Sequence, residues 1–321
     1  MNTNSVIVKI KQKTYHIRHL HEYTRSLSFM KSRYEFIHKI APFTWLDDKY
    51  FLEYYFFRKM GHRINFLNPQ SFNEKLNWMK LFDRNPFYSQ ISDKTLLRDY
   101  VSDNVGSQYL KPIIGVFDNF KEIDWDQLPD KFVIKASHGS GWNILCEDKS
   151  RFQKTTVKES IEMWLKQNHY QQSREWQYKN IIPKIIVEHF LETDPYYGSV
   201  EYQLYCFDGV TRFIQVDIDC LRNHSRQFLT PGWKIAPFQI TRYPRYDNPF
   251  PKPAHFDDAK TIAELLTKDL PFCRVDMYIQ TNQIYVCEMT LMPAGGFMSF
   301  DPPNYDFEIG RWLKLRRYIR E

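Results

Sequence analysis

A lysine at the end of an apolar run, followed by a small glycine-bearing loop, is the clearest chemical feature of the sequence. The run 132–134 leads into Lys135, and the loop reads Ser137-His138-Gly139-Ser140-Gly141. An ammonium left unpaired beside a buried run is costly or has its pKa lowered, so this lysine favours an anion opposite it. Backbone N–H groups of the loop can close on the same anion. The segment predicts a phosphate site, although it is not a Walker loop, whose lysine follows its glycines.

Two neighbouring strands near the C-terminus form a second candidate site. Arg274-Val275-Asp276 lies on one expected strand and Glu288-Met289-Thr290 on the next. Alternation places Arg274 and Asp276 on one face of the first strand, and Glu288 and Thr290 on one face of the second. Two carboxylates and a hydroxyl that face each other in apolar strands favour a cation between them, and hard oxygen ligands suit Mg²⁺. The alternative is a structural ion pair between Arg274 and Glu288.

Composition indicates a folded protein with room for two domains. Of the 321 residues, 43% are hydrophobic and 26% charged. The five cysteines form no Cys-x-x-Cys pattern, and an odd number without a secretory signal predicts reduced thiols and a cytoplasmic location. No window reaches the length of a membrane span. Because no nucleic-acid-binding motif is recognisable, we expect no nucleic acid partner.

Basic charge gathers at the two ends of the chain. Residues 1–40 hold eight Lys and Arg against two Glu, so their net charge of +6 equals that of the whole protein. Residues 311–320 are again basic, with Trp312, Leu315 and Ile319 at helical spacing. The simpler interpretation is solvated helix faces that pack by their aromatic sides. The alternative is a peripheral membrane contact that attracts anionic lipids or a lipid-linked substrate.

The order of expected elements predicts an α+β protein. Residues 1–65 have helix-like spacing, and Ser71 with Glu74 forms a capping box for the helix that follows. Further helices are expected from Ser92, as a cap, to Val101, and over 154–167 and 258–266. Strands are expected over 113–117, 132–135, 185–191, 201–207, 210–219, 272–279 and 283–290, the last four as two hairpins. Helices alternate with strands early and hairpins dominate late, which favours two lobes with a cleft between them.

Taken together, these motifs resemble those of ATP-grasp enzymes and, more narrowly, of the TupA-like family found in bacterial surface-polysaccharide loci. The resemblance covers roughly residues 65–310. It depends on Ser71-Phe72-Asn73-Glu74-Lys75-Leu76, Asp93-Lys94, the run 128–135, His138-Gly139-Ser140-Gly141 and Arg274-Val275-Asp276. It implies an ATP-grasp fold, in which two α+β lobes clasp ATP. The implied parts are a mainly helical basic N-terminal region (1–85), a small lobe with a glycine-rich lid (86–191), and a large lobe with the metal site and a basic C-terminal helix (192–321).

The resemblance also implies how the nucleotide is held. Lys94 and Lys135 would bind the α- and β-phosphates of ATP. Glu188 and the backbone just after it would line the adenine pocket, and Glu201 would bind the ribose. The lid over the phosphates would comprise Ser137, His138, Gly139, Ser140 and Gly141. His138 would contact the γ-phosphate or an acyl phosphate, or would instead stabilise its loop through a backbone hydrogen bond.

A metal and a charge-stabilising group are implied at the second site. Asp276 and Glu288 would bind Mg²⁺, with Thr290 where many ATP-grasp enzymes have asparagine. Arg274 would stabilise charge on the transferred phosphoryl group or on the tetrahedral intermediate. Backbone N–H groups of Gly295 and Gly296 would act on the same charge.

The implied activity is that of an ATP- and Mg²⁺-dependent carboxylate–amine ligase. ATP would phosphorylate a carboxylate, and an amine would displace phosphate to give an amide. The carboxylate would belong to a sugar acid, soluble, polymeric or lipid-linked, in capsular polysaccharide or O-antigen synthesis, and the amine to an amino acid or amino compound. Three alternatives remain open: a kinase acting on a sugar hydroxyl, a nucleotide-sugar glycosyltransferase with Asp217 and Asp219 as its metal ligands, and a scaffold without turnover.

Overall fold

The computed structural model describes the backbone of residues 3–316 and the side chains of residues 22–316. The chain divides into two compact units between Pro69 and Gln70. In the first unit, α1 (Thr3–Ile40) packs against α2 (Trp45–Met60) through Met30, Tyr54 and Phe57. Within the described residues, no helix combines the length and the apolar character that crossing a bilayer requires.

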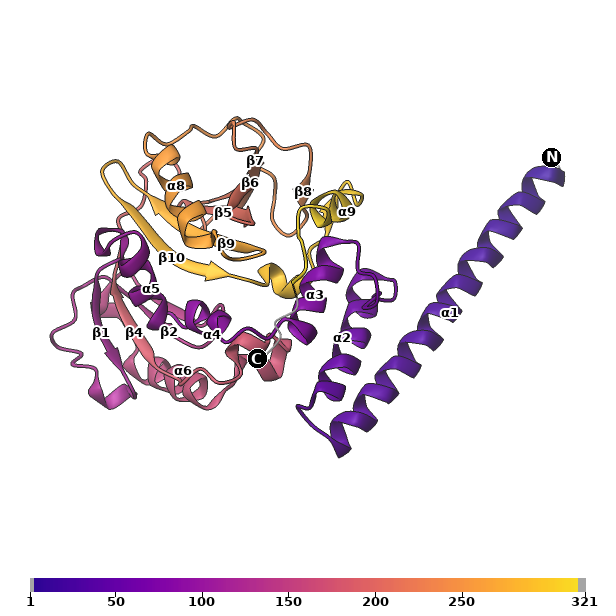
Figure 1. Cartoon of the computed structure of the whole chain (residues 1–321), viewed down its shortest axis with the longest axis horizontal. Coiled ribbons are helices and arrows are strands. Elements are labelled where there is room, and N and C mark those ends of the chain that lie inside the picture. Colours follow the sequence, from indigo (N-terminus) through magenta and orange to yellow (C-terminus); the bar gives the residue numbers. More distant parts are fainter. Residues whose placement is uncertain (1–2, 317–321) are drawn as a thin grey trace. The chain divides into compact units, whose positions relative to one another are not determined.

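A four-stranded antiparallel sheet forms one lobe of the second unit (Figure 1). Its strand order is β1-β4-β2-β3. The strands are β1 (Ile113–Phe117), β2 (Phe132–Ala136), β3 (Asn143–Cys146) and β4 (Ile185–His189). In β2, Phe132, Ile134 and Ala136 are buried in a core with Ile161 and Trp164 of α6 (Lys154–Lys166). Since side chains alternate along a strand, Val133 and Lys135 point to the other face, away from α6.

The other lobe is a five-stranded antiparallel sheet with the order β10-β9-β5-β6-β7. Its strands are β5 (Glu201–Phe207), β6 (Val210–Ile218), β7 (Ser225–Leu229), β9 (Cys273–Ile279) and β10 (Ile284–Thr290). The helix α8 (Phe256–Thr267) packs on this sheet (Figure 1). The turn between β5 and β6 is Asp208-Gly209, both with positive φ, as tight hairpin turns require.

Short elements connect these sheets. The remaining α-helices are α3 (Phe72–Phe82), α4 (Phe87–Ser92), α5 (Leu96–Asn104), α7 (His169–Ser173) and α9 (Tyr305–Gly310). The 3-10 turns are η1 (Ser107–Tyr109), η2 (Phe120–Glu122), η3 (Lys149–Arg151), η4 (Trp176–Tyr178) and η5 (Pro293–Gly296). A two-stranded sheet pairs β8 (Gln239–Ile240) with β11 (Phe300–Asp301).

Local sequence signals predicted one helix start and missed another. The capping box of α3 is confirmed, because Ser71 Oγ accepts the Glu74 N–H and Glu74 Oε2 accepts the Ser71 N–H, both at 3.1 Å. The start expected at Ser92 is wrong. Asp93 Oδ1 accepts the N–H of Thr95 at 2.8 Å and its hydroxyl at 2.7 Å, which holds the chain in a turn until α5 begins at Leu96.

The basic C-terminal helix expected over 311–320 is not seen in residues 311–316, and residues 317–320 lie outside the described part. Lys75 Nζ donates to the carbonyls of Gly310 and Leu313, both at 2.8 Å, and Leu313 is buried, so the segment after α9 is held against α3 as a turn that does not continue the helix. The predicted domain limits at 85 and 191 stay predictions. The compact second unit already includes α3.

Candidate active site

Lys135 lies at the centre of a buried cluster of charges on the small sheet. Its Nζ is 2.9 Å from Glu188 Oε2 on the neighbouring strand β4. Lys111 Nζ donates to the same oxygen, also at 2.9 Å. Burial alone would raise the pKa of Glu188, but the two ammonium groups lower it to about 2. One carboxylate therefore neutralises only one of two cations, and the cluster keeps a net positive charge that suits a phosphate.

The glycine loop is fixed at its base and exposed at its tip. Ser137 is buried: its N–H donates to Lys184 O at 2.9 Å, and its Oγ accepts the Lys184 N–H at 3.1 Å. Gly139 packs closely against Trp142, since an added Cβ would lie 2.5 Å from the indole ring. In contrast, the loop residues Ser140 and Gly141 are exposed. That the loop acts as a lid stays a prediction.

His138 is part of the fixed base. Its side chain is buried, and Nε2–H donates to the carbonyl of Trp164 at 2.9 Å. Burial lowers the pKa of the imidazole, against the opposing effect of the hydrogen bond to Trp164, and the charge of Lys94 lowers it further, which favours the neutral form. This geometry corresponds to the loop-stabilising alternative. A contact with the γ-phosphate stays a prediction.

Lys94 joins the glycine loop to the second candidate site. It lies in the turn just before α5, and its Nζ donates to Gly139 O at 2.8 Å. The same ammonium is 3.6 Å from Glu288 Oε1 on β10. The side chain of Lys94 is 11% exposed and that of Glu288 is 26% exposed, so this contact between the two lobes is partly shielded from solvent.

The second candidate site is the hairpin of β9 and β10. Asp276 is directly opposite Glu288, and Arg274 is opposite Thr290. A bulge at Cys287 creates this register, because without the extra residue Cys287 would face Asp276. Arg274 binds the Asp276 carboxylate through two hydrogen bonds of 2.6 and 2.5 Å and donates to Thr290 Oγ1 at 3.2 Å. The sequence offered a structural ion pair between Arg274 and Glu288 as an alternative. In the structure, Arg274 binds Asp276 and Thr290 instead, and Glu288 is in contact with Lys94.

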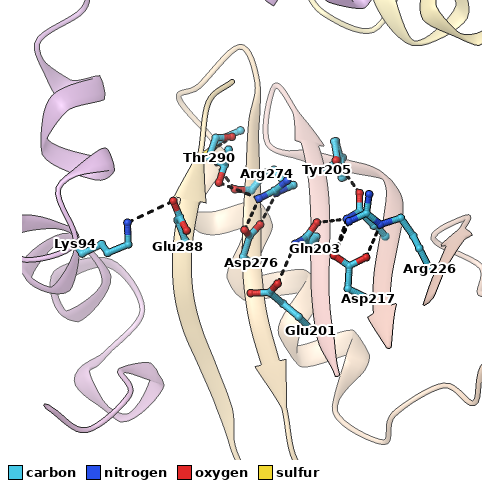
Figure 2. A network of polar contacts seen from close by, with 12 residues as sticks. Lys94, Glu201, Gln203, Tyr205, Asp217, Arg226, Arg274, Asp276, Glu288 and Thr290 are labelled. Carbon is cyan, nitrogen blue, oxygen red and sulfur yellow. Dashed lines mark hydrogen bonds and ion pairs between the residues drawn. The ribbon is translucent and has the colours of Figure 1, made fainter. Parts of the chain in front are cut away.

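From this hairpin, polar side chains continue in a row across the large sheet (Figure 2). Gln203 on β5 is paired with Asp276 across the strands and donates to Glu201 Oε2 at 3.0 Å. Gln215 on β6 donates to Gln203 and, at 3.1 Å, to Asp217 Oδ2. From β10 to β7, the row consists of Glu288 and Thr290, Arg274 and Asp276, Glu201 and Gln203, Gln215 and Asp217, and Arg226.

Asp217 and Asp219 do not form a shared metal site. Arg226 on β7 binds the Asp217 carboxylate through both Nε and Nη2, the latter at 2.8 Å. Burial would raise the pKa of Asp217, but His224 and Arg226 lower it to about 2. Asp219 lies beyond the end of β6 with a φ of 51° and accepts the Asn223 N–H at 3.0 Å. This geometry weakens the glycosyltransferase alternative.

A pocket of about 710 Å³ is lined by both lobes. Val133 and Leu145 line it from the small sheet, and Tyr202 and Tyr278 from the large sheet. The segment after Glu188 contributes residues 190–195 and 197–200, and Lys111 reaches the pocket from the charge cluster. Its apolar and aromatic walls suit a planar base. The carboxylate of Glu201 belongs to the polar row instead, and its predicted contact with ribose stays a prediction.

The residues predicted to bind metal have suitable chemistry for Mg²⁺. Burial raises the pKa of Asp276, and the nearby carboxylates of Glu201 and Glu288 add to this against the effect of Arg274. These clustered carboxylates are hard oxygen donors that a divalent cation would stabilise. In the described part of the chain, no group of three or more His, Cys, Asp or Glu side chains has metal-binding geometry. Mg²⁺ is commonly held by one or two carboxylates together with substrate phosphates.

The loop that carries Gly295 and Gly296 begins shortly after β10. Ala294, Gly295 and Gly296 have φ values of 50°, 61° and 74°. The Gly295 N–H donates to Met292 O at 2.8 Å, so in this conformation it is used within the loop. The predicted contribution of both glycines to charge stabilisation stays a prediction.

A family model described as TupA-like ATPgrasp matches residues 74–314. The chain belongs to the TupA-like ATP-grasp family. The predicted fold class is thereby confirmed: this TupA-like protein has an ATP-grasp fold of two α+β lobes, with a helical region before it.

Solved structures with low sequence identity are similar to this TupA-like protein. D-alanine–D-alanine ligase from Bacillus anthracis complexed with ATP is 14% identical, with 63% of this chain and 54% of that chain covered and a TM-score of 0.35. D-cycloserine synthetase DcsG is 16% identical, with 71% and 72% covered and a TM-score of 0.39. The ATP-grasp ligase PsnB, complexed with a phosphomimetic variant of its minimal precursor, Mg and ADP, is 10% identical, with 68% and 56% covered and a TM-score of 0.34. The chain thus spans about half the length of the first of these. A search of curated proteins gave no match.

Several residues of this region were missed from the sequence. Lys111 is 77 positions from Glu188, and a lysine before a proline gives no local signal of that contact. Arg226 and Gln215 join the polar row only through strand register. Tyr178 is buried within electrostatic range of Glu288, which contributes, after burial, to raising the pKa of its phenol.

Proposed function

We propose that this protein is an ATP- and Mg²⁺-dependent carboxylate–amine ligase. The observation that carries the proposal is the position of Lys94, which contacts both the glycine loop at Gly139 and the carboxylate of Glu288. A cationic phosphate site and an acidic metal site therefore meet at one point between two lobes. That arrangement suits the transfer of a phosphoryl group between bound reactants.

The nucleotide would lie between the lobes. Its base would occupy the pocket that follows Glu188, and its phosphates would contact Lys135 and Lys94 beneath the tip Ser140-Gly141. Lys94 and Lys135 would exchange part of their contact with Glu288 and Glu188 for the phosphates. Closure of the tip would exclude water, which would otherwise hydrolyse an acyl phosphate.

The hairpin of β9 and β10 would serve the reacting end of ATP. Asp276 and Glu288, with Thr290, would hold Mg²⁺, which neutralises phosphate charge when bound. Arg274 would stabilise charge on the γ-phosphoryl group as it passes to the carboxylate oxygen and ADP leaves. The amine nitrogen would then attack the acyl carbon, the bond to phosphate would break, and an amide would form with loss of a proton.

The proposed substrates are a sugar acid and an amino acid or amine, in the synthesis of a capsule or O-antigen. Membership of the TupA-like family supports this part of the proposal. The test is ADP release from the full chain with ATP, Mg²⁺ and pools of sugar acids and amino acids. Hydroxylamine then separates two activities, since a ligase yields a hydroxamate from its acyl phosphate, whereas a kinase acting on a hydroxyl does not.

A cytoplasmic location with peripheral contact to anionic membranes is also proposed. On α1, Phe29, Phe36 and Ile40 are exposed and have the spacing of one helix face, and Arg33 lies on the same face. Exposed aromatic side chains beside cations favour an anionic lipid surface. Pelleting with anionic vesicles should be lost in a Phe29→Ser/Phe36→Ser variant. Equal pelleting of the variant and the unchanged protein would contradict this contact.

A further inference from the structure

One face of α3 carries three buried polar side chains that the proposed reaction does not use. Asn73, Asn77 and Lys80 are spaced four and three residues apart, which places them on one side of the helix. All three side chains are buried. The face begins within the motif Ser71–Leu76. The capping box of Ser71 and Glu74 accounts for the first turn of the helix but not for these three side chains.

All three side chains bind the backbone of the loop after β10. Lys80 Nζ donates to Gly295 O and Asn77 Nδ2 donates to Gly296 O, both at 2.7 Å. Asn73 Nδ2 donates to Met298 O at 2.9 Å, and its Oδ1 accepts the Met298 N–H at 2.7 Å. The helix thus binds three of the four backbone carbonyls of the segment 295–298.

The loop needs such support because of its conformation. Ala294, Gly295 and Gly296 are three successive residues with positive φ, and Ala294 has a Cβ that disfavours this region. There is no room to replace Gly296, since a Cβ there would lie 2.9 Å from Asn77 Nδ2. In a trans peptide the C=O and N–H point in opposite directions, so the bond from Lys80 to Gly295 O fixes the direction of the Gly296 N–H.

Lys80 also connects this loop to the C-terminal end of α7. Its Nζ donates to Ser173 O at 3.1 Å, and Glu175 contributes a nearby negative charge. Burial lowers the pKa of Lys80 to about 8, against the opposing effect of Glu175. A buried ammonium is costly for a fold, and a role in holding two backbone segments accounts for its presence here.

We propose that Asn73, Asn77 and Lys80 form the element that positions the Gly295–Gly296 loop, and that Lys80 is a positioning residue for the transfer step. The role in transfer rests on the proposed ligase function. The holding of the loop does not, and it can be tested separately.

The matched variants are Lys80→Met and Lys75→Met. Lys75 lies on the same helix, and its Nζ also donates to two backbone carbonyls, those of Gly310 and Leu313, away from the Gly295–Gly296 loop. In the full chain, we expect Lys80→Met to lose hydrogen-exchange protection over residues 293–298, while Lys75→Met keeps it. If Lys80→Met does not fold, Lys80→Gln is compared with Lys75→Met instead. The glutamine amide still has an N–H group that can donate to one of the two carbonyls, those of Gly295 and Ser173.

The kinetic comparison separates positioning from a general loss of fold. We expect Lys80→Met to lower kcat of amine-dependent product formation about tenfold to a hundredfold, with KM for ATP within about twofold of the unchanged protein. Lys75→Met should keep kcat per folded molecule. The proposal is overturned if Lys80→Met keeps protection over 293–298, if it keeps kcat, or if Lys75→Met lowers kcat equally. If the unchanged protein releases no ADP with any substrate pool, the ligase proposal and the role of Lys80 in transfer both fail. Hydrogen exchange then still tests whether α3 holds the Gly295–Gly296 loop.

Discussion

The charge cluster of Lys135, Glu188 and Lys111 gives a quantitative prediction for Glu188→Gln. The pKa of Glu188 falls from an ordinary 4.5 to about 2 in the folded protein. At about 1.4 kcal/mol for each pKa unit, ionised Glu188 contributes about 3 kcal/mol to the free energy of unfolding. The substitution also leaves two buried ammonium groups facing a neutral amide. We therefore expect a loss of about 3 kcal/mol at pH 7 in chemical denaturation.

The pH dependence of this loss follows from the direction of the pKa change. Because the folded pKa is depressed, the contribution of Glu188 is fully present above about pH 4.5 and disappears as the pH falls towards 2. The difference between the unchanged protein and Glu188→Gln should therefore shrink by about 2 kcal/mol between pH 7 and pH 3. Lys111→Met is the control, since it leaves Glu188 paired with Lys135 and should cost less at pH 7. A loss below about 1 kcal/mol, or a difference independent of pH, would refute the reasoning.

Three further predictions concern other parts of the site. Asp276→Asn should lower Mg²⁺-dependent ADP release by at least about a hundredfold without loss of fold, and near-normal release would exclude Asp276 as a metal ligand. Gly139→Ala should weaken ATP binding, measured by calorimetry, by about tenfold, because its Cβ would displace Trp142 and the Gly139 carbonyl that binds Lys94. Gly141→Ala should also weaken ATP binding, because Gly141 has a φ of 74°, which disfavours a residue with a Cβ even though no atom lies within 4 Å of it. Asp217→Asn should cost about 2 kcal/mol of stability, since Arg226 loses its carboxylate, yet keep ATP turnover; loss of ATP turnover in folded protein would contradict this, whereas binding of a nucleotide sugar that disappears in Asp217→Asn would revive the glycosyltransferase alternative.

The parts of the fold predicted from sequence depend on local patterns. The capping box at Ser71 and Glu74 involves neighbouring residues, and the hairpins show alternation and turn chemistry, so their signals are complete within short windows. The prediction of a helix start at Ser92 was wrong for a local reason too. Serine and aspartate both cap helices and form turns, and here the side chain of Asp93 forms a turn around Thr95.

The parts of the site that could not be predicted depend on contacts between distant segments. The pairing of Lys111 with Glu188 joins the approach to β1 with β4, and the bulge at Cys287 alone decides which residue faces Asp276. The contacts from α3 to the Gly295–Gly296 loop cross more than 200 positions. Sequence patterns indicate which residue types are available, but such contacts arise only when distant segments meet in the folded chain.

The central claim is that one site transfers phosphate from ATP to a carboxylate and then replaces it with an amine. Hydroxylamine trapping tests this most directly, with the full chain, ATP, Mg²⁺ and a pool of sugar acids. The account predicts ADP and a hydroxamate in equal amounts, both lost in Asp276→Asn. A phosphorylated sugar without hydroxamate would indicate a kinase instead, and ATP binding without any ADP release would contradict catalysis by this site.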